Sequence, residues 1–164
     1  MGRRSARVIG LVLAGVACAC SPQAASDEQS APAADTGVHA TSGLRIIPVV
    51  VSTGESSHEF RAELADTKEL QAKGLMHRTQ LGPDEAMLFP NAQPIARSFW
   101  MKNTPIPLDL IFVGLDGSIT NIAAMAEPYS EDPIYSVGSV SAVLEIAGGR
   151  AEELGIEPGD QVSW

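Results

Sequence analysis

The segment from Phe99 to Asp109 gathers the most varied chemistry in the chain: two large aromatic side chains, a cation, an amide, a hydroxyl and a carboxylate. Its two prolines stiffen the backbone, so polar groups held there lose less entropy when they bind a ligand. Trp100 and Lys102 fall on one side of an extended chain. An indole beside polar groups can stack against a sugar or another ring while those groups hydrogen-bond its rim. The segment therefore predicts a ligand-binding surface around Trp100.

The same segment also has a structural interpretation. Asn103 and Thr104 are residue types that commonly close turns by bonding the backbone. Asp109 is flanked by two leucines, so it can be a buried acid that ties the loop down. Under this interpretation the polar groups maintain the fold and bind nothing.

Two further charged residues lie where a partner is required. Arg78 follows a predicted helix, and its guanidinium can hold a carboxylate of Asp109, of Glu145 or of a ligand. Glu145 alternates with Val143 in an apolar run, and burying an unpaired charge is very costly. We favour an Arg–carboxylate pair that fixes the fold over an acid with a raised pKa that is poised for proton transfer.

These residues lead us to expect a non-catalytic binding or accessory domain, with no catalytic residue assigned and with a small molecule, a glycan or an envelope protein as partner. The candidate ligand-binding residues are Arg78, Trp100, Lys102, Asn103, Asp109 and Glu145. One alternative is a hydrolase of an envelope polymer that uses Asp109 and Glu145, which requires two carboxyls about 5–10 Å apart across a cleft. Another is a structural or assembly protein that contacts a partner through an acidic strand face with Glu59 and Glu63.

The sequence predicts no metal and no cofactor. The three histidines, His39, His58 and His77, lie at no spacing that suits one metal ion. Both cysteines precede residue 21, and the sequence contains neither a phosphate-binding loop nor a Gly-x-Ser-x-Gly elbow.

Residues 1–19 have the pattern of a secretory signal peptide. Three arginines in residues 1–7 precede an uncharged apolar run, which is too short to span the ~30 Å hydrocarbon core of a membrane. The run ends in small residues and two cysteines and resembles a lipoprotein signal, in which we favour Cys20 for lipidation, with Cys18 as the alternative. We expect an exported protein on the periplasmic face of a bacterial membrane, attached only through its lipid, or a soluble periplasmic protein.

Composition divides the rest of the chain into a linker and one domain. Residues 20–43 are rich in Ala, Ser, Pro and acid, so they bury too little apolar surface to offset their ordering entropy, and a disordered linker is predicted. Residues 44–164 have room for a single globular domain. The 164 residues include 20 acidic residues and 11 Lys and Arg, a net charge of −9, which excludes binding to nucleic acid by phosphate neutralisation.

The apolar patterning of residues 44–164 predicts a mainly β fold, a small antiparallel barrel or sandwich with about seven short strands and two short helices. Pro48 indicates that the first strand is bent or lies at an edge. The expected strands cover residues 44–51, 59–65, 87–89, 95–101, 108–113, 118–126, 140–146 and 161–164.

Local signals mark the helices and one hairpin. Asp66 or Thr67 can cap a short helix that ends at Gly74, and a second helix is expected over residues 150–154. Asp116-Gly117, between two apolar strands, is a strong signal for a tight hairpin.

Several stretches together resemble one bacterial and archaeal family, known as domain of unknown function 192. The match covers about residues 58–164, and the block around Trp100 is quite specific to it. The stretches are ELADT (63–67), GLMHR (74–78), MLF (87–89), FWMKNTPIPLD (99–109), VLEI (143–146) and GIEPGD (155–160). The resemblance implies a small β-rich, barrel-like domain, often exported or lipid-anchored, and no established activity. It carries the family's motif positions onto the six candidate residues, while Ala86 stands where the family has a Gly before Met87.

Overall fold

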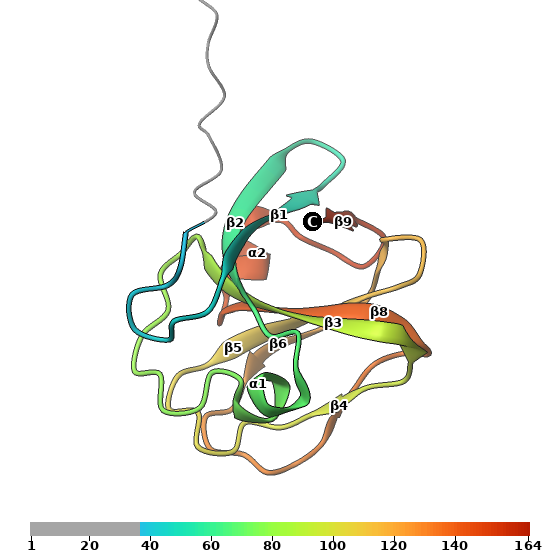
Figure 1. The fold of residues 1–164 in the computed structure, drawn as a ribbon. Coiled ribbons are helices and arrows are strands. Elements are labelled where there is room, and N and C mark those ends of the chain that lie inside the picture. The colour runs from blue at the N-terminus through green and yellow to red at the C-terminus, as the bar shows by residue number, and fades with distance from the viewer. Residues whose placement is uncertain (1–36) are drawn as a thin grey trace, which may run out of the picture. The chain divides into compact units, whose positions relative to one another are not determined.

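The computed structural model describes residues 37–164, so the predicted signal peptide and both cysteines lie outside the described residues. The described part is mainly β, with two sheets and two short helices (Figure 1). Among these residues, no helix is long and apolar enough to cross a membrane. The strands are β1 (Ile46–Ser52), β2 (Ser57–Leu64), β3 (Glu85–Ile95), β4 (Ser98–Phe99), β5 (Leu108–Val113), β6 (Ile119–Ala126), β7 (Ile134–Tyr135), β8 (Val140–Ala147) and β9 (Gln161–Ser163), and the helices are α1 (Lys68–Lys73) and α2 (Arg150–Leu154).

Seven of the strands form one strongly curved sheet in the order β6-β5-β8-β3-β2-β1-β9. All neighbours in it are antiparallel except β2 and β3, which are parallel because α1 lies between them in the chain. Figure 1 shows β1, β2 and β9 on one side of β3 and β8, with α1 and β4 on the other. The predicted mainly β class is confirmed, in a sandwich-like form whose sheet is not closed into a barrel.

The central strands are covered on both faces, which produces two apolar cores. The inner core fills the concave side of the sheet, and the outer core lies between the sheet and the segments that carry α1 and β4. All six residues of β5 are buried, as expected for a strand that lacks a solvated face. The inner core includes Val49, Phe60, Leu88, Ile111, Leu144 and Ile146, and the outer core includes Met87, Phe89, Leu108, Leu110, Phe112 and Val143.

The local signals for α1 and for the hairpin are confirmed. The hydroxyl of Thr67 accepts a hydrogen bond from the backbone N–H of Leu70, and Gly74 ends the helix with a positive φ of 48°. At the hairpin, β5 and β6 pair in antiparallel fashion around Gly117, whose φ is 81°. A few residues with strong conformational preferences therefore fix these two turns.

The strand predicted over residues 95–101 is wrong in its bounds. Instead, β3 continues through Pro90 and Pro94 to Ile95, with an irregular register after Pro90, and β4 contains only two residues. The pairing of β3 with β2 ends at Leu88. Beyond that point one side of β3 has no β2 partner, so a residue without a backbone N–H is tolerated there.

The predicted end of the linker also needs correction. Residues 37–43 belong to the folded unit: Val38 forms a β-bridge with Arg45, and the backbone N–H of His39 donates to the carbonyl of Leu44. Composition misses this boundary because backbone bonds and one buried contact of His39, described below, hold a segment that has almost no large apolar residues.

The turn after β8 requires a residue without a side chain. A Cβ on Gly148 would lie 2.8 Å from Cβ of Pro107 and 2.9 Å from its carbonyl carbon, whereas a Cβ on Gly54 would meet nothing within 4 Å. Gly148→Ala is expected to lower the free energy of unfolding by about 1–3 kcal/mol, because backbone cannot move aside cheaply. Gly54→Ala is the matched control, with a change below about 0.5 kcal/mol in urea unfolding. Equal unfolding midpoints for the two variants would contradict this account.

Candidate ligand-binding site

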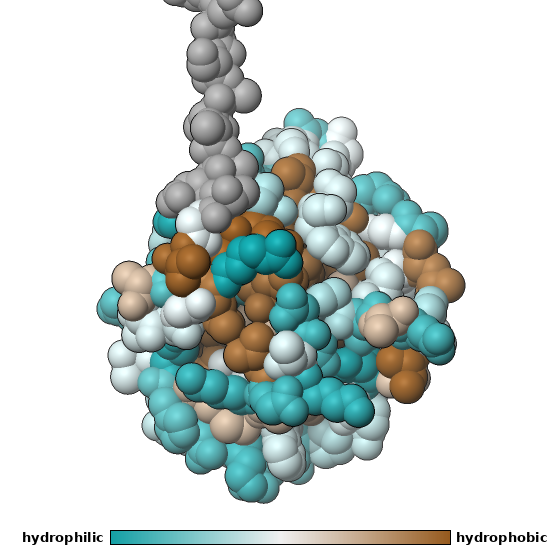
Figure 2. Space-filling model, in the orientation of Figure 1, coloured by the Kyte–Doolittle hydropathy of each residue, from teal (hydrophilic) through white to brown (hydrophobic). Residues whose placement is uncertain are grey.

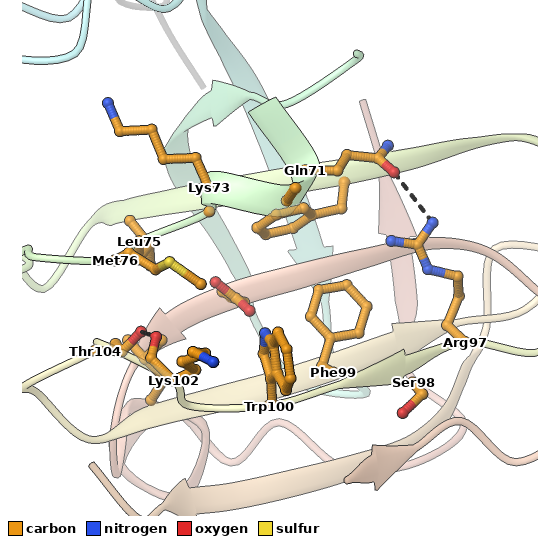
Figure 3. Close-up of a pocket in the computed structure, with 15 residues that line it drawn as sticks. Gln71, Lys73, Leu75, Met76, Arg97, Ser98, Phe99, Trp100, Lys102 and Thr104 are labelled. Carbon is orange, nitrogen blue, oxygen red and sulfur yellow. Dashed lines mark hydrogen bonds between the residues drawn. The ribbon is translucent and has the colours of Figure 1, made fainter. Parts of the chain in front are cut away.

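A cavity of about 320 Å³ opens between the end of α1 and the segment that carries β4. Figure 3 shows Phe99 and Trp100 on one side of it, Gln71 on the opposite side, and the thioether of Met76 reaching into the space between them. This volume lies at the lower end of the ~300–1,000 Å³ usual for small-molecule sites. We call it the first cavity; its walls also include Lys73, Phe89, Arg97, Lys102, Thr104, Leu108 and Glu145.

Glu145 is a buried acid that lines this cavity. It lies on β8 opposite Met87 of β3 and Leu110 of β5, on the face of the outer core, and is 5% exposed. Within residues 37–164 its carboxyl forms no hydrogen bond and no ion pair. Burial raises its pKa to about 8, because desolvation disfavours the charged form. At neutral pH the group therefore keeps its proton and can donate a hydrogen bond into the cavity.

The aromatic wall of the cavity carries two cations. Lys102 Nζ lies 5.1 Å from the centre of the Trp100 ring and 3.6 Å from a carboxylate oxygen of Glu131. The guanidinium of Arg97 lies 5.1 Å from the centre of the Phe99 ring. Trp100 is 49% exposed, so much of its surface is open to a ligand.

Arg97 is held in place by neutral groups. Its Nη1 donates to the amide oxygens of Asn91 (2.7 Å) and Gln71 (3.2 Å), and the second of these bonds is drawn in Figure 3. Partial burial lowers its pKa, but an arginine remains protonated in proteins. The cavity therefore has a positioned charge that is not neutralised by an acid among its hydrogen-bond partners.

Three turns with unusual backbone geometry meet beside the cavity. His77 (φ 64°), Asn103 (φ 55°) and Tyr129 (φ 64°) all have left-handed conformations, which are uncommon for residues other than glycine. The backbone N–H of His77 donates to the carbonyl of Asn103, and that of Tyr129 donates to the carbonyl of Thr104. Such strain is characteristic of sites that the surrounding structure holds in a defined geometry.

Three of the six candidate residues line the first cavity and three do not. Trp100, Lys102 and Glu145 line the first cavity, whereas Arg78, Asn103 and Asp109 do not. Asn103 belongs to the adjacent turn, where its side-chain amide lies 3.8 Å from the sulfur of Met76.

Arg78 binds a carboxylate that the sequence did not suggest. Its Nη2 contacts Oε1 of Glu63, and His39 Nδ1 lies 3.6 Å from the same oxygen. The expected partners Asp109 and Glu145 are therefore replaced by Glu63, which is 2% exposed although strand alternation assigned it to a solvated face. The alternation fails there because His39 and Arg78 cover that end of β2.

Asp109 is buried and holds neighbouring segments of the backbone together. It is fully buried, and its carboxylate accepts backbone hydrogen bonds from Met125 (2.8 Å), Gly149 (2.9 Å) and Ala151 (2.8 Å). These bonds join β5 to β6 and to the first turn of α2, whose N-cap Gly149 has no side chain to bond that turn. Asp109 is thus buried as one interpretation of the sequence expected, but its carboxylate ties β6 and α2 to β5 and not the loop that precedes it.

The carboxyls of Asp109 and Glu145 do not share a cleft. Asp109 lies opposite Ile146 on the inner-core face, whereas Glu145 lies opposite Leu110 on the outer-core face. Successive side chains of a strand point to opposite faces, so the sheet itself separates the two groups.

Sequence reasoning missed several walls of the cavity. Gln71 and Lys73 were assigned only to a helix, and Arg97 only to a strand. Arg97 lies two residues before Phe99, where the predicted ligand-binding segment begins, and could have been included on that ground. No sequence signal brings α1 to this place, because its position results from tertiary packing. Among the described residues there is no group of three or more His, Cys, Asp or Glu that could hold a metal ion.

Comparison with known proteins identifies relatives of the chain. A family model described as an uncharacterized ACR, domain of unknown function 192, matches residues 49–164. A crystal structure of a protein of unknown function from Novosphingobium aromaticivorans is 55% identical, with 78% of this chain and 91% of that chain covered and a TM-score of 0.77. One from Sinorhizobium meliloti, provisionally described as a transcription regulator, is 37% identical, with 73% and 94% covered and a TM-score of 0.71. No curated protein matches the chain.

The titration of Glu145 gives the stability a defined pH dependence. In the folded protein its pKa is about 8, against an ordinary value of 4.5, so between these values the folded state binds more protons than the unfolded state. The stabilising contribution of the protonated group is complete below about pH 4.5 and is lost as the pH rises to about 8. At about 1.4 kcal/mol for each pKa unit, the loss is of the order of a few kcal/mol.

Glu145→Gln keeps the shape of the side chain and removes this titration. In urea unfolding between about pH 5 and pH 8, the variant is expected to lack the decline and to gain stability relative to the wild type as the pH rises. Glu152→Gln, at an exposed position of α2, should follow the wild-type curve. Parallel curves for Glu145→Gln and the wild type would rule out a raised pKa.

Proposed function

This chain belongs to the domain of unknown function 192 family, and we propose that its folded domain binds a small, ring-bearing organic anion in the first cavity without catalysing a reaction. The observation that carries the proposal is the unpartnered carboxyl of Glu145, buried on the wall of a cavity large enough for a small ligand. The carboxyl has no partner among the described residues, and its oxygens are not sealed off but open onto the cavity. A ligand in the cavity can therefore supply the hydrogen bond that the protein does not.

The charge of the cavity supports an anion. Within the part of the chain that the structure describes, Arg97 forms no ion pair, and Lys102 shares its charge with the exposed Glu131. Because Glu145 is neutral below about pH 8, the walls carry a net positive charge at neutral pH. This charge contrasts with the net −9 of the whole chain.

Different side chains of the first cavity bind different parts of the ligand. The half-exposed indole of Trp100 offers an apolar surface against which a ring packs. Lys102 and Arg97, at two places along the aromatic wall, attract the anionic group, and the protonated Glu145 donates a hydrogen bond to an acceptor on the ligand.

The two alternative functions receive less support. Cleavage of a polymer by a pair of carboxyls requires both groups at one bond, whereas Asp109 and Glu145 lie on opposite faces of the sheet, and Asp109 is fully bonded to the backbone. Contact with a partner through the acidic face of β2 requires Glu63 at the surface, whereas Glu63 is buried against Arg78.

The proposal includes the location that the amino terminus suggests. The basic start, the short apolar run and the two cysteines support export and attachment to the periplasmic face of a membrane through a lipid on Cys20, or release as a soluble periplasmic protein after ordinary signal cleavage. These residues lie outside the described part, so this component rests on sequence alone.

Fluorescence of Trp100 tests ligand binding directly. The chain has two tryptophans, so Trp164→Phe, at the last residue, leaves Trp100 as the sole indole. Titration of this variant with galacturonate and with cyclohexanecarboxylate is expected to give a saturable change for at least one of them. The neutral counterparts, methyl galactoside and cyclohexanemethanol, should bind about fivefold or more weakly, because they lack the charged contact.

A matched pair of lysine variants controls for general electrostatics. Lys102→Gln removes a cation of the first cavity, whereas Lys68→Gln removes one at the start of α1 that does not line it. The first is expected to weaken binding of the anion about fivefold and the second to leave it unchanged. Failure of both anions to saturate, or equal loss in the two variants, would refute binding at this site.

The anchor is tested by fractionation of bacterial cells that produce the full chain. Cys20→Ala should move the protein from the membrane fraction into the soluble periplasmic fraction, because the lipid is its only proposed attachment. If this variant stays in the membrane fraction while Cys18→Ala releases the protein, lipidation is at Cys18. If neither variant changes the fraction, the lipoprotein proposal is refuted.

A further inference from the structure

We infer that the ligand is an extended acidic oligosaccharide, which occupies the first cavity with one ring and continues across two further cavities towards Arg78. This inference rests on the proposed function and names the substrate class of the same site. It derives from three adjoining cavities, the unpaired cations of the first two, and the kind of side chains that line the second and third.

The three cavities adjoin one another. The second, of about 290 Å³, shares Lys73, Gly74 and Met76 with the first. The third, of about 250 Å³, shares the walls formed by Thr41, His77 and Arg78 with the second. Each alone is near or below the ~300 Å³ lower bound for small-molecule sites, so each suits one ring-sized unit. A chain of linked rings uses all three.

The positive charge of the domain is concentrated along this course. Of the 11 Lys and Arg residues, three precede residue 37, which leaves eight in the described part. Half of these eight line the three cavities: Lys73, Arg97 and Lys102 in the first two, and Arg78 where the second meets the third. Arg78 is paired with the buried Glu63, and the wall of the third cavity includes the acidic Glu85, so those of the four that are unpaired within the described part lie in the first two cavities. The described part also contains 17 of the 20 acidic residues, so the unpaired cations Lys73 and Arg97 stand out from it and select a ligand with more than one negative charge.

Lys73 lies at the junction of the first two cavities. It is the last residue of α1, and Figure 3 shows its amine directed away from Trp100 and out of the first cavity. The side chain lines the second cavity as well. It is therefore placed to meet an anionic group of a second unit rather than the one beside Trp100.

The polar side chains that line the second and third cavities favour an acidic polymer of sugars over other acidic polymers, because they can bond to sugar hydroxyls. Thr41 and Ser42 line the second cavity, and Thr79 and Gln80 line the third. Their hydroxyl and amide groups both donate and accept hydrogen bonds. Apolar side chains are also present, and Figure 2 shows hydrophobic residues grouped above α1 between hydrophilic ones. A sugar ring has both kinds of surface.

An extended acidic peptide fits the course less well. Peptides commonly bind by adding a strand to a free sheet edge. The edges of the large sheet are β6 and β9, and none of their residues lines any of the three cavities. The path instead follows the end of α1, several turns and the two residues of β4, and so short a strand offers no long row of free backbone groups.

The test measures affinity against chain length. In the Trp164→Phe background, galacturonate, its dimer and its tetramer are titrated, with fully methyl-esterified tetramer as the neutral probe. The tetramer is expected to bind about tenfold or more tightly than the monomer, because it engages the added cavities. The esterified tetramer should lose most of this gain.

A substitution remote from the first cavity separates the two claims. Thr41→Glu places a negative charge at an exposed position that lines only the second and third cavities. It is expected to weaken tetramer binding about fivefold while monomer binding stays within about twofold. Ser57→Glu, exposed at the start of β2 and outside all three cavities, adds the same charge and should change neither.

Each outcome decides something. Monomer binding with no gain from length, or no effect of Thr41→Glu on the tetramer, overturns the extended ligand and leaves the proposed function intact. Cyclohexanecarboxylate binding without any galacturonide binding overturns the sugar class alone. Poly-L-glutamate that binds as tightly as the tetramer overturns it in favour of an acidic peptide. If none of these anions binds, the proposed function fails as well.

Discussion

Burial of the central strands on both faces is the constraint on which the rest of the structure depends. A polar side chain in the buried part of β5 or β8 has apolar neighbours whichever way it points. Its desolvation must be offset by hydrogen bonds or reduced by loss of its charge. Asp109 and Glu145 meet this requirement differently. The first receives three backbone N–H groups and joins β5, β6 and α2. The second receives none, keeps its proton and faces a cavity. The neighbouring strands β5 and β8 thus carry Asp109, which holds the fold together, on one face of the sheet. On the other face they carry Glu145, whose carboxyl has no hydrogen-bond partner among the described residues.

Features with local causes could be predicted from the sequence, and features with tertiary causes could not. Thr67, Gly74 and Asp116-Gly117 act through their own backbone preferences, so the helix and the hairpin follow from them. Glu63 obeys strand alternation in the sequence, but residues from outside its strand bury it. Whether Glu145 meets a cation or a cavity depends on where α1 packs, which no residue pattern encodes. Trp100 and Lys102 were predicted because their types and their spacing coincide on one short segment.

The walls of the first cavity come from segments that are held rigidly relative to one another. The turns at His77, Asn103 and Tyr129 have left-handed geometry, and backbone hydrogen bonds connect them. Phe99 packs edge-on against both Phe89 and Phe112, with ring centres 5.2 and 6.2 Å apart. Walls that are held in this way keep little conformational freedom that a ligand would have to restrict. The strain of the turns is sustained by the packing around them.

The family match begins at residue 49, yet His39, Thr41, Ser42 and Leu44 help to form the second and third cavities. The part of the chain that matches the family therefore forms the first cavity, and the short segment before it forms much of the walls of the second and third cavities. The segment is joined to the scaffold by backbone bonds, because Val38 forms a β-bridge with Arg45 and the backbone N–H of Ile46 in β1 donates to the carbonyl of Gly37. A domain trimmed to the family boundaries would lose these walls together with residues 46–48, the first part of β1.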